Sequence, residues 1–402
     1  MPTLTYPAET NHRAQIQTWV KHIHALAEEI GPRGPTREGE RQGHIYCQQT
    51  FDSLGLQSHW EGFRSAQSIF TPHLIASLAF LAAFVIYPLA GRTSTVVATL
   101  IAAVTLASQL MELSFINNPL RWIVPKGDSQ NVFAIQEPAG EHKQDLILIG
   151  HVDSQRTPLI FKSDGWLRAY QIFTTVAFVA FMLMVVLYVL AIFTQWNWIW
   201  PVSAVSALCA LLLAALSIQA DLTPFTHGAN DNATAAGLVL TLAEHLQSEP
   251  LQHTRVWLVN SGCEEVQHYG TIDFLDRHLD DFKNPHALVL EMLGCAGPGW
   301  LVKEGIVIPF KATPKLVELA ESVNAAHPEL DGYPVSVSGG NTEMADALRR
   351  GIPAITLFGM TRQNLAPYWH RISDTVDKID PQALEKNYAF AWHYIHALDK
   401  TV

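Results

Sequence analysis

The sequence predicts an α/β fold in which a mixed central sheet is flanked by helices and interrupted by two inserted pairs of apolar helices. Short apolar runs of strand length end in ionisable residues, segments with helical periodicity lie between them, and four longer apolar runs contain no Asp, Glu, Lys or Arg. A chain of 402 residues has room for an α/β domain of roughly 280 to 300 residues and a second element. The apolar runs form that second element.

Three strand-like runs are followed by residues that can take part in chemistry. Catalytic groups in open α/β sheets collect at the carboxyl ends of the strands, so we expect these residues to lie close together. The runs and their ionisable residues are 145–150 with His151 and Asp153, 254–259 with Glu264 and Glu265, and 288–290 with Glu291.

The adjacent carboxylates Glu264 and Glu265 are the most informative pair. Two neighbouring carboxylates at the end of a buried strand repel each other and lose hydration, so a cation or a proton must compensate them. One of them can bind a metal while its neighbour takes a proton from metal-bound water. The alternative is a solvated loop that happens to contain two acids.

Two further candidates lie in loops. Asp231 stands in a turn of small residues before a helical pattern, where its alternative role is an N-cap. His370 precedes an acidic turn, and its alternative is a surface histidine. The five candidate donors are hard oxygen and imidazole ligands, which suit a pair of zinc ions sharing one carboxylate. They are His151, Asp231, Glu265, Glu291 and His370.

The order of these motifs resembles peptidase family M28, the co-catalytic zinc peptidases that include leucyl-type aminopeptidases. The motifs are H-x-D at 151–153, D-N-A-T-A at 231–235, E-E at 264–265, L-E-M-L-G at 290–294 and H-R-I-S-D-T at 370–375. The early loop at 30–39 and the Gly-Ile-Pro-Ala at 351–354 are also similar. Thr342 and Glu343 stand where the family usually has Ser-Asp. The resemblance implies a zinc-exopeptidase-like fold.

The resemblance also implies two zinc sites that share Asp231. One ion would take His151, Asp231 and Glu291, and the other Asp231, Glu265 and His370. Glu264 would be the general base, and Asp153 would hold the ring of His151. The family usually has Asp at the position of Glu291, so the carboxylate of this chain reaches one methylene further.

Four apolar runs predict two membrane-spanning helical hairpins. The runs at 170–193 and 198–218 are long enough to cross a hydrocarbon core of about 30 Å. The runs at 74–90 and 96–111 are near the lower limit, and their alternative is a buried or re-entrant hairpin. Trp196, Trp198 and Trp200 resemble an interfacial aromatic belt.

The hairpins divide the α/β domain into three parts. We predict boundaries at 1–70, 71–112 (hairpin 1), 113–168, 169–220 (hairpin 2) and 221–402. The short turn at 137–144 favours antiparallel pairing of 131–136 with 145–150. Both hairpins would then leave on the side that carries His151, which predicts a metal centre near the membrane surface.

Basic residues predict that the α/β domain is cytoplasmic. Only Arg92 lies in the links at the opposite ends of the hairpins, and cytoplasmic loops carry the excess of Lys and Arg. The basic residues on the domain side are Arg64, Arg121, Lys126, Lys162 and Arg168.

The sequence therefore predicts a membrane-anchored zinc exopeptidase, and among exopeptidases it favours an aminopeptidase acting on peptide substrates. The alternatives are a glutaminyl-cyclase-like enzyme on the same scaffold and a non-catalytic membrane scaffold or receptor. A net charge of −11 argues against a nucleic-acid partner. The sequence leaves the substrate, the end specificity and the oligomeric state open.

Overall fold

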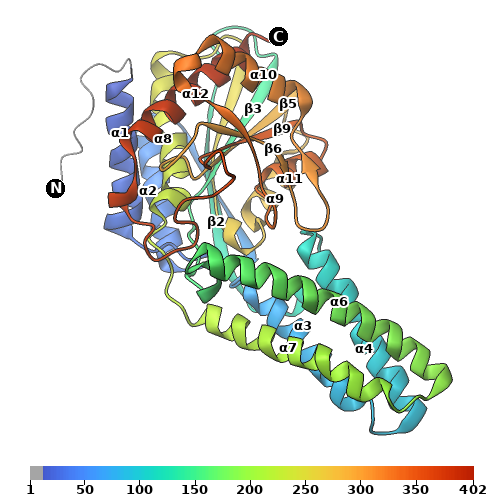
Figure 1. Cartoon of the computed structure of the whole chain (residues 1–402). Coiled ribbons are helices and arrows are strands. Elements are labelled where there is room, and N and C mark those ends of the chain that lie inside the picture. The colour runs from blue at the N-terminus through green and yellow to red at the C-terminus, as the bar shows by residue number, and fades with distance from the viewer. Residues whose placement is uncertain (1–11) are drawn as a thin grey trace. The chain divides into compact units, whose positions relative to one another are not determined.

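The computed structural model describes residues 12–402, which form two compact units (Figure 1). The first unit comprises the described part of 1–65 together with 126–155 and 225–402. The second comprises 66–125 and 156–224. The second unit takes in 113–125 and 156–168, which the predicted boundaries assigned to the α/β domain.

The described part of the first unit contains a nine-stranded mixed sheet. The strands follow the order β1-β2-β4-β3-β5-β9-β6-β7, and β8 pairs with β6. Neighbours among β4, β3, β5 and β9 are parallel, whereas β2 is antiparallel to β4 and β6 to β9. The strands are β1 Ser58–Ala66, β2 Lys126–Gln136, β3 Gln144–His151, β4 Thr254–Ser261, β5 Pro285–Glu291, β6 Gly299–Glu304, β7 Phe310–Lys311, β8 Tyr333–Ser336 and β9 Ala354–Phe358.

Strands β2 and β3 do not pair, so the predicted hairpin between them was wrong. They run in opposite directions, but β4 lies between them and pairs with both. The connecting turn crosses the start of β4, where Ala139 N donates to Leu251 O at 2.8 Å. A turn of this length can span two strand spacings, about 10 Å. Its backbone N–H groups find acceptors in the segment that leads into β4.

Helices cover both faces of the sheet. Figure 1 shows α1, α8 and α12 together on one side and α9 with α11 on the other. Strand β3 is buried along its whole length, as expected for a parallel strand covered on both faces. The helices are α1 Arg13–His24, α2 Glu38–Ser53, α8 Thr234–Ser248, α9 Tyr269–His278, α10 Pro314–Ala326, α11 Met344–Arg349 and α12 Pro381–Asp399.

Helix α8 lies unusually close to the sheet. A Cβ atom at Gly150 would stand 2.8 Å from the backbone carbon of Ala235, so only glycine fits there. Most residues of α8 are buried, including Leu238 and Leu242. This close contact fixes the start of α8 next to His151, the residue after Gly150.

The second unit consists of apolar helices, of which three have the length and composition of membrane spans. These three are α4, α6 and α7, whereas α3 is a shorter apolar helix of 17 residues. The finding supports three candidate spans rather than the predicted four. The bounds are α3 Phe70–Ile86, α4 Gly91–Leu113, α5 Pro119–Ile123, α6 Asp164–Thr194 and α7 Ile199–Asp221.

The packing of this unit is typical of helices in lipid. Small side chains such as Ala177 and Ala210 are buried between the helices, whereas Leu183, Val205 and Leu208 are exposed. In a bundle that is stable in water, the large apolar residues face inward. Helices surrounded by lipid instead use small residues where their backbones approach each other.

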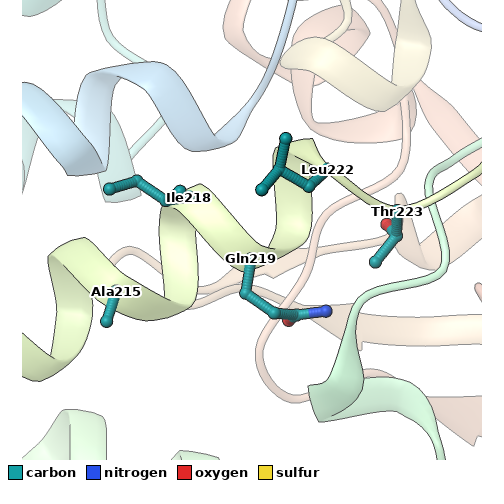
Figure 2. A pocket seen from close by; sticks show the side chains of 5 residues that line it. All are labelled: Ala215, Ile218, Gln219, Leu222 and Thr223. Atoms are coloured by element: carbon teal, nitrogen blue, oxygen red, sulfur yellow. The ribbon is translucent and has the colours of Figure 1, made fainter.

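The end of α7 is tied to neighbouring segments of the same unit. A hollow of about 520 Å³ lies beside Ile218, Gln219 and Leu222, whose side chains are drawn in Figure 2. Gln219 Oε1 accepts a hydrogen bond from Leu159 N at 3.2 Å, and Arg156 Nε lies 3.7 Å from Asp221 Oδ1. These polar contacts mark the end of the apolar bundle.

Arg121 has a structural role that its sequence position did not indicate. It is 6% exposed and its Nε lies 2.9 Å from Oε2 of the buried Glu112. Asn118 Nδ2 donates to the same carboxylate at 2.5 Å. Because Arg121 pairs with a buried carboxylate, its charge does not contribute to the excess of basic residues that predicts the cytoplasmic side.

The first prediction concerns acid stability and His22. The histidine is 6% exposed and its Nδ1 lies 2.7 Å from the hydroxyl of Tyr46. Burial, assisted by Lys21, lowers the pKa of His22 to about 4 from its usual 6.5. The unfolded chain therefore binds more protons between these values, and stability falls as the pH falls from 6.5 to 4, by up to about 3 kcal/mol.

Thermal unfolding of detergent-solubilised protein between pH 8 and pH 4 measures this effect. His22→Gln keeps an acceptor for Tyr46, and we expect its midpoint to depend less on pH than that of the wild type. Some dependence will remain, because burial also lowers the pKa of His44 to about 4. Equal slopes for wild type and variant would contradict the assignment.

Candidate metal centre

The fold brings all five predicted donors together. His151 ends β3 and Glu291 ends β5, and the Glu264–Val266 turn follows β4. These parallel strands are neighbours, so their carboxyl ends meet at one edge of the sheet. Asp231 enters from the Ala229–Ala233 turn before α8, and His370 from the loop after β9.

The two histidines face opposite oxygens of Asp231. His151 Nε2 lies 3.6 Å from Asp231 Oδ1 and 3.7 Å from Glu291 Oε2. His370 Nε2 lies 3.4 Å from Asp231 Oδ2 and 3.1 Å from Glu265 Oε2. Asp231 therefore lies between two groups of potential ligands.

These separations fit metal ligands better than hydrogen bonds. Two ligand atoms about 2.0–2.1 Å from a tetrahedral zinc ion lie about 3.3 Å from each other, whereas good hydrogen bonds are shorter than most of these distances. Ligand atoms of His151, Asp231 and Glu265 all lie within 4.8 Å of one another. Asp231 Oδ2 and Glu265 Oε1 are buried and accept no hydrogen bond from any residue that the structure describes.

The electrostatics of the cluster also favour a bound cation. Burial, with Glu265 as the next contribution, raises the pKa of Asp231 well above its usual range. Burial and Glu264 do the same to the pKa of Glu265, and burial raises that of Glu291. Carboxylates in this environment must share positive charge or hold protons. The donor set and its charge therefore fit zinc.

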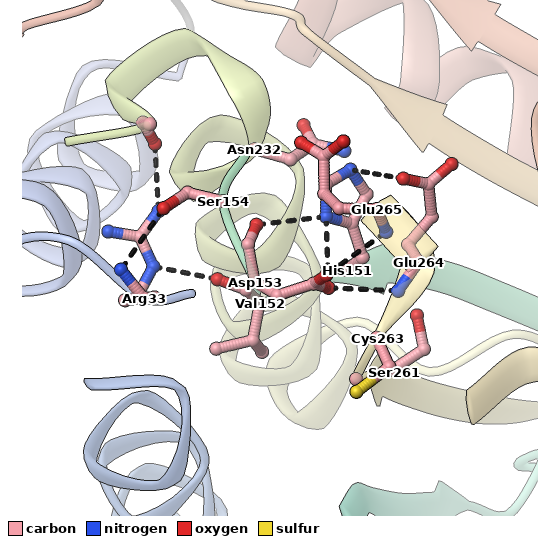
Figure 3. A network of polar contacts seen from close by, with 12 residues as sticks. Arg33, His151, Val152, Asp153, Ser154, Asn232, Ser261, Cys263, Glu264 and Glu265 are labelled. Carbon is pink, nitrogen blue, oxygen red and sulfur yellow. Dashed lines mark hydrogen bonds and ion pairs between the residues drawn. The ribbon is translucent and has the colours of Figure 1, made fainter. Parts of the chain in front are cut away.

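Asp153 has a wider role than holding the ring of His151. One carboxylate oxygen lies 3.4 Å from His151 Nδ1. The two oxygens also accept the backbone N–H groups of Glu264 at 3.1 Å and Glu265 at 3.0 Å (Figure 3). Cys263, just before them, has a φ of 55°, in the left-handed region. Asp153 therefore fixes the turn that presents both glutamates.

Asp374 and Asn232 fix the other carboxylates. Asp374 accepts the backbone N–H groups of Asn230 at 2.7 Å and Asp231 at 3.0 Å. Asn232 Nδ2 donates to Glu291 Oε2 at 3.0 Å. The Asp231–Asn232 peptide bond is cis. These contacts hold the shared carboxylate and the longer Glu291 side chain in place.

A buried arginine joins the two loops that carry His151 and Asp231. Arg33 is fully buried and donates to five backbone carbonyls. Two of them flank the site, Val152 O at 2.7 Å and Gly228 O at 2.8 Å. Figure 3 shows Arg33 beside Val152 and Ser154. The early loop of the sequence therefore acts as a clamp on the metal-binding loops.

The candidate base Glu264 has a histidine partner, His268, that is not among the predicted site residues. His268 Nε2 lies 3.1 Å from Glu264 Oε1, and His268 Nδ1 lies 2.6 Å from Asp346 Oδ2. The two histidines that lie beside the Glu264 carboxylate, His268 and His151, are both buried. Burial alone would raise the pKa of Glu264, but His151 and His268 outweigh it and lower that pKa to about 2. The spacing of His268 four residues after Glu264 was the available signal.

Glu343, the residue that departs from the usual family pattern, lies inside the domain. Its Oε1 accepts a hydrogen bond from Ser261 Oγ at 3.0 Å, and burial raises its pKa to about 8. The preceding Thr342 donates to Glu304, another buried acid whose pKa burial raises to about 8. A layer of buried acids thus lies behind the candidate metal centre.

Comparison with known proteins gives a family match and a set of structural relatives. The family model described as Peptidase family M28 matches residues 216–395, which include Asp231, Glu265, Glu291 and His370 but not His151. No curated protein matches this chain.

Several solved structures share the fold. Glutaminyl cyclase from Tannerella forsythia is 14% identical with a TM-score of 0.55, over 95% of this chain and 98% of that one. A leucine aminopeptidase precursor from Bacteroides thetaiotaomicron is 11% identical with a TM-score of 0.56, over 95% and 96%. A zinc aminopeptidase from Bacillus subtilis is 13% identical with a TM-score of 0.55, over 95% and 94%. At these identities the likeness establishes the mixed α/β fold of zinc exopeptidases.

The second prediction tests the arginine clamp. Arg33→Met leaves five buried carbonyls without their donor, and we expect a loss of at least about 3 kcal/mol of unfolding free energy. We also expect metal to be lost on dialysis, because two of those carbonyls belong to the metal-binding loops. Thermal unfolding and metal analysis measure both effects.

Arg41→Met on the exposed surface of α2 is the matched control and should change stability by less than about 0.5 kcal/mol. Arg33→Lys should fall between the two, because an ammonium group has fewer donors than a guanidinium. Metal retention in Arg33→Met equal to that of the control would contradict the clamp.

Proposed function

We propose that this chain is a membrane-anchored zinc metallopeptidase of the M28 type, and that it acts as an aminopeptidase. The observation that carries the proposal is the position of Asp231 between two histidines, each with its own further carboxylate. That arrangement suits two zinc ions, with His151 and Glu291 on one and Glu265 and His370 on the other.

Zinc ions at such a site polarise a scissile carbonyl and make a water molecule acidic near neutral pH. The chain's own contribution to hydrolysis is Glu264, which has no place in either donor group. Its Oε2 lies 3.7 Å from His151 Nε2, beside the candidate ligands. Glu264 takes the proton of the attacking water and returns it to the amine nitrogen when the C–N bond breaks.

His268 and Asp346 position this base. A carboxylate that rotates freely would seldom point at the water, whereas Glu264 Oε1 is fixed by His268 at 3.1 Å. Asp346, 2.6 Å from the other ring nitrogen, sets the direction of the imidazole. Both act through Glu264 and do not contact the reacting atoms.

A glutaminyl-cyclase-like activity is the second candidate, because glutaminyl cyclases are among the solved structures with this fold. Cyclisation of an amino-terminal glutamine releases ammonia, whereas an aminopeptidase releases a free amino acid. Product analysis therefore separates the two. A non-catalytic scaffold or receptor is disfavoured, because this chain keeps all five donors and Glu264.

The membrane anchor is supported by the lipid-type packing of the second unit and its three candidate spans. Helix α3 completes the bundle as a shorter fourth element, packed against α4 and α7. We place the peptidase domain in the cytoplasm, since Arg64, Lys126, Lys162 and Arg168 lie on its side of the spans. The partners would then be the bilayer and peptide substrates.

The third prediction joins metal content to activity. We expect the detergent-purified wild type to bind about two zinc ions per chain and to release amino acids from aminoacyl substrates. Glu264→Gln should keep that zinc but lose about 100- to 10,000-fold in kcat, because the base is gone while the ligands remain.

His370→Ala is the matched variant on the ligand side and should lose zinc as well as activity. A Glu264→Gln variant that hydrolyses substrate at the wild-type rate would overturn the proposed role. A wild-type chain that binds no zinc after supplementation would overturn the metallopeptidase itself.

The fourth prediction concerns the positioning residues. His268→Gln and Asp346→Asn should each lower kcat about tenfold, with KM and zinc content unchanged, because both act on the reaction through Glu264. The double variant should be no worse than His268→Gln, since Asp346 acts only through that histidine. Additive losses, or loss of zinc in either variant, would indicate a general structural role instead.

A further inference from the structure

The hairpin between β6 and β7 carries three consecutive exposed apolar residues. Ile306, Val307 and Ile308 are 42%, 45% and 41% exposed at its tip. The residue that leads into the tip is held in place, because Gly305 N donates to Gly340 O at 3.1 Å and Gly339 N donates to Gly305 O at 3.2 Å. Single exposed apolar residues are common, but a contiguous group at a fixed tip indicates a contact surface.

Cationic side chains surround the base of this hairpin. Lys303 and Lys311 are exposed and stand directly opposite each other on β6 and β7. Like charges at such a pair destabilise a hairpin. The guanidinium of Arg349 lies 4.8 Å from the ring of Phe310. Glu304, the single acidic residue of 299–311, is fully buried and accepts hydrogen bonds from Thr342.

We propose that this hairpin inserts its tip into the surface of an anionic lipid bilayer. Interfacial segments combine apolar residues that enter the headgroup region with basic residues that meet anionic lipid. The unfavourable Lys303–Lys311 pair becomes favourable when a negative surface faces it. The inference rests on the membrane anchor of the proposed function, since a chain held at the bilayer has a high local concentration there and a weak contact suffices.

The hairpin is linked to the candidate metal centre through consecutive contacts. Glu304 accepts from Thr342, and the neighbouring Glu343 accepts from Ser261 Oγ at 3.0 Å. Ser261 is paired with His151 in the sheet. Docking of the hairpin would thus hold this part of the domain at the bilayer and favour substrates whose ends lie near the membrane surface.

Spin labels on the full chain, reconstituted into vesicles, test the proposal. Val307, Val186 and Lys400 are replaced by cysteine one at a time in a Cys295→Ser background, in which the three remaining native cysteines, Cys47, Cys209 and Cys263, are buried and so shielded from the label. Val186 is exposed in the middle of α6 and reports the anchor. Lys400 is exposed and lies two residues after Leu398. The carbonyl of Leu398 accepts a hydrogen bond from Gln144, which begins β3, whereas His151 ends that strand. Position 400 therefore serves as the control away from the candidate metal centre. Accessibility to oxygen and to a polar nickel chelate is measured.

With vesicles of phosphatidylglycerol and phosphatidylcholine, we expect labels at 307 and 186 to be accessible to oxygen and protected from the chelate. The label at 400 should behave as in water. Lys303→Gln with Lys311→Gln, or vesicles of phosphatidylcholine alone, should reduce protection at position 307 several-fold without changing position 186.

Three other patterns of label accessibility would contradict the proposal, and each has a different cause. If position 186 is protected and 307 is as accessible to the chelate as 400, the hairpin does not dock although the anchor stands. If 307 is protected from both oxygen and chelate, the tip contacts protein rather than lipid. If 186 is accessible to the chelate, the membrane anchor fails, and the hairpin proposal fails with it.

Discussion

The constraint on which this structure depends is the burial of several carboxylates at one edge of a parallel sheet. Asp231, Glu265 and Glu291 are each less than a tenth exposed, and burial raises the pKa of all three. An uncompensated buried charge costs several kcal/mol. The fold therefore needs positive charge at this edge, and the imidazoles of His151 and His370, when deprotonated, are donors with which a divalent cation can meet that need.

The surrounding chain is organised to hold these acids rather than to neutralise them. Asp153 and Asp374 accept backbone N–H groups of the loops that present the metal-site carboxylates. Arg33 contributes its charge from a distance, because its five hydrogen bonds go to carbonyls and not to carboxylates. Asp231 and Glu265 are thus held through their backbone, and Asp231 Oδ2 and Glu265 Oε1 accept no hydrogen bond from any described residue. Such supporting contacts commonly decide metal affinity.

The sequence was sufficient to predict the α/β fold, the apolar insertions and the five donors that the fold brings together. His151 and Glu291 end apolar strands and Glu265 lies shortly after one, whereas Asp231 and His370 stand in loops and were indicated by the order of motifs that resembles family M28. It was insufficient where a contact joins distant segments. The place of β4 between β2 and β3 depends on pairing across more than 100 residues of chain, and local turn length suggested a simple hairpin instead. Arg33 looked like part of an early loop, and Asp346 carried no local signal, because their partners lie far away in the sequence. Helix α3 is shorter than a membrane span because it ends at Ile86, whereas the predicted apolar run continues to residue 90.

The most direct measurement of the central claim is X-ray absorption at the zinc edge of the loaded protein. We predict a first shell of nitrogen and oxygen only, with imidazole scattering and a metal–metal distance of about 3.5–4 Å. Cys263 should not appear in it, because its thiol donates to Glu40 at 3.3 Å. A sulfur ligand at about 2.3 Å, or zinc without a second metal at full loading, would contradict the shared-carboxylate site.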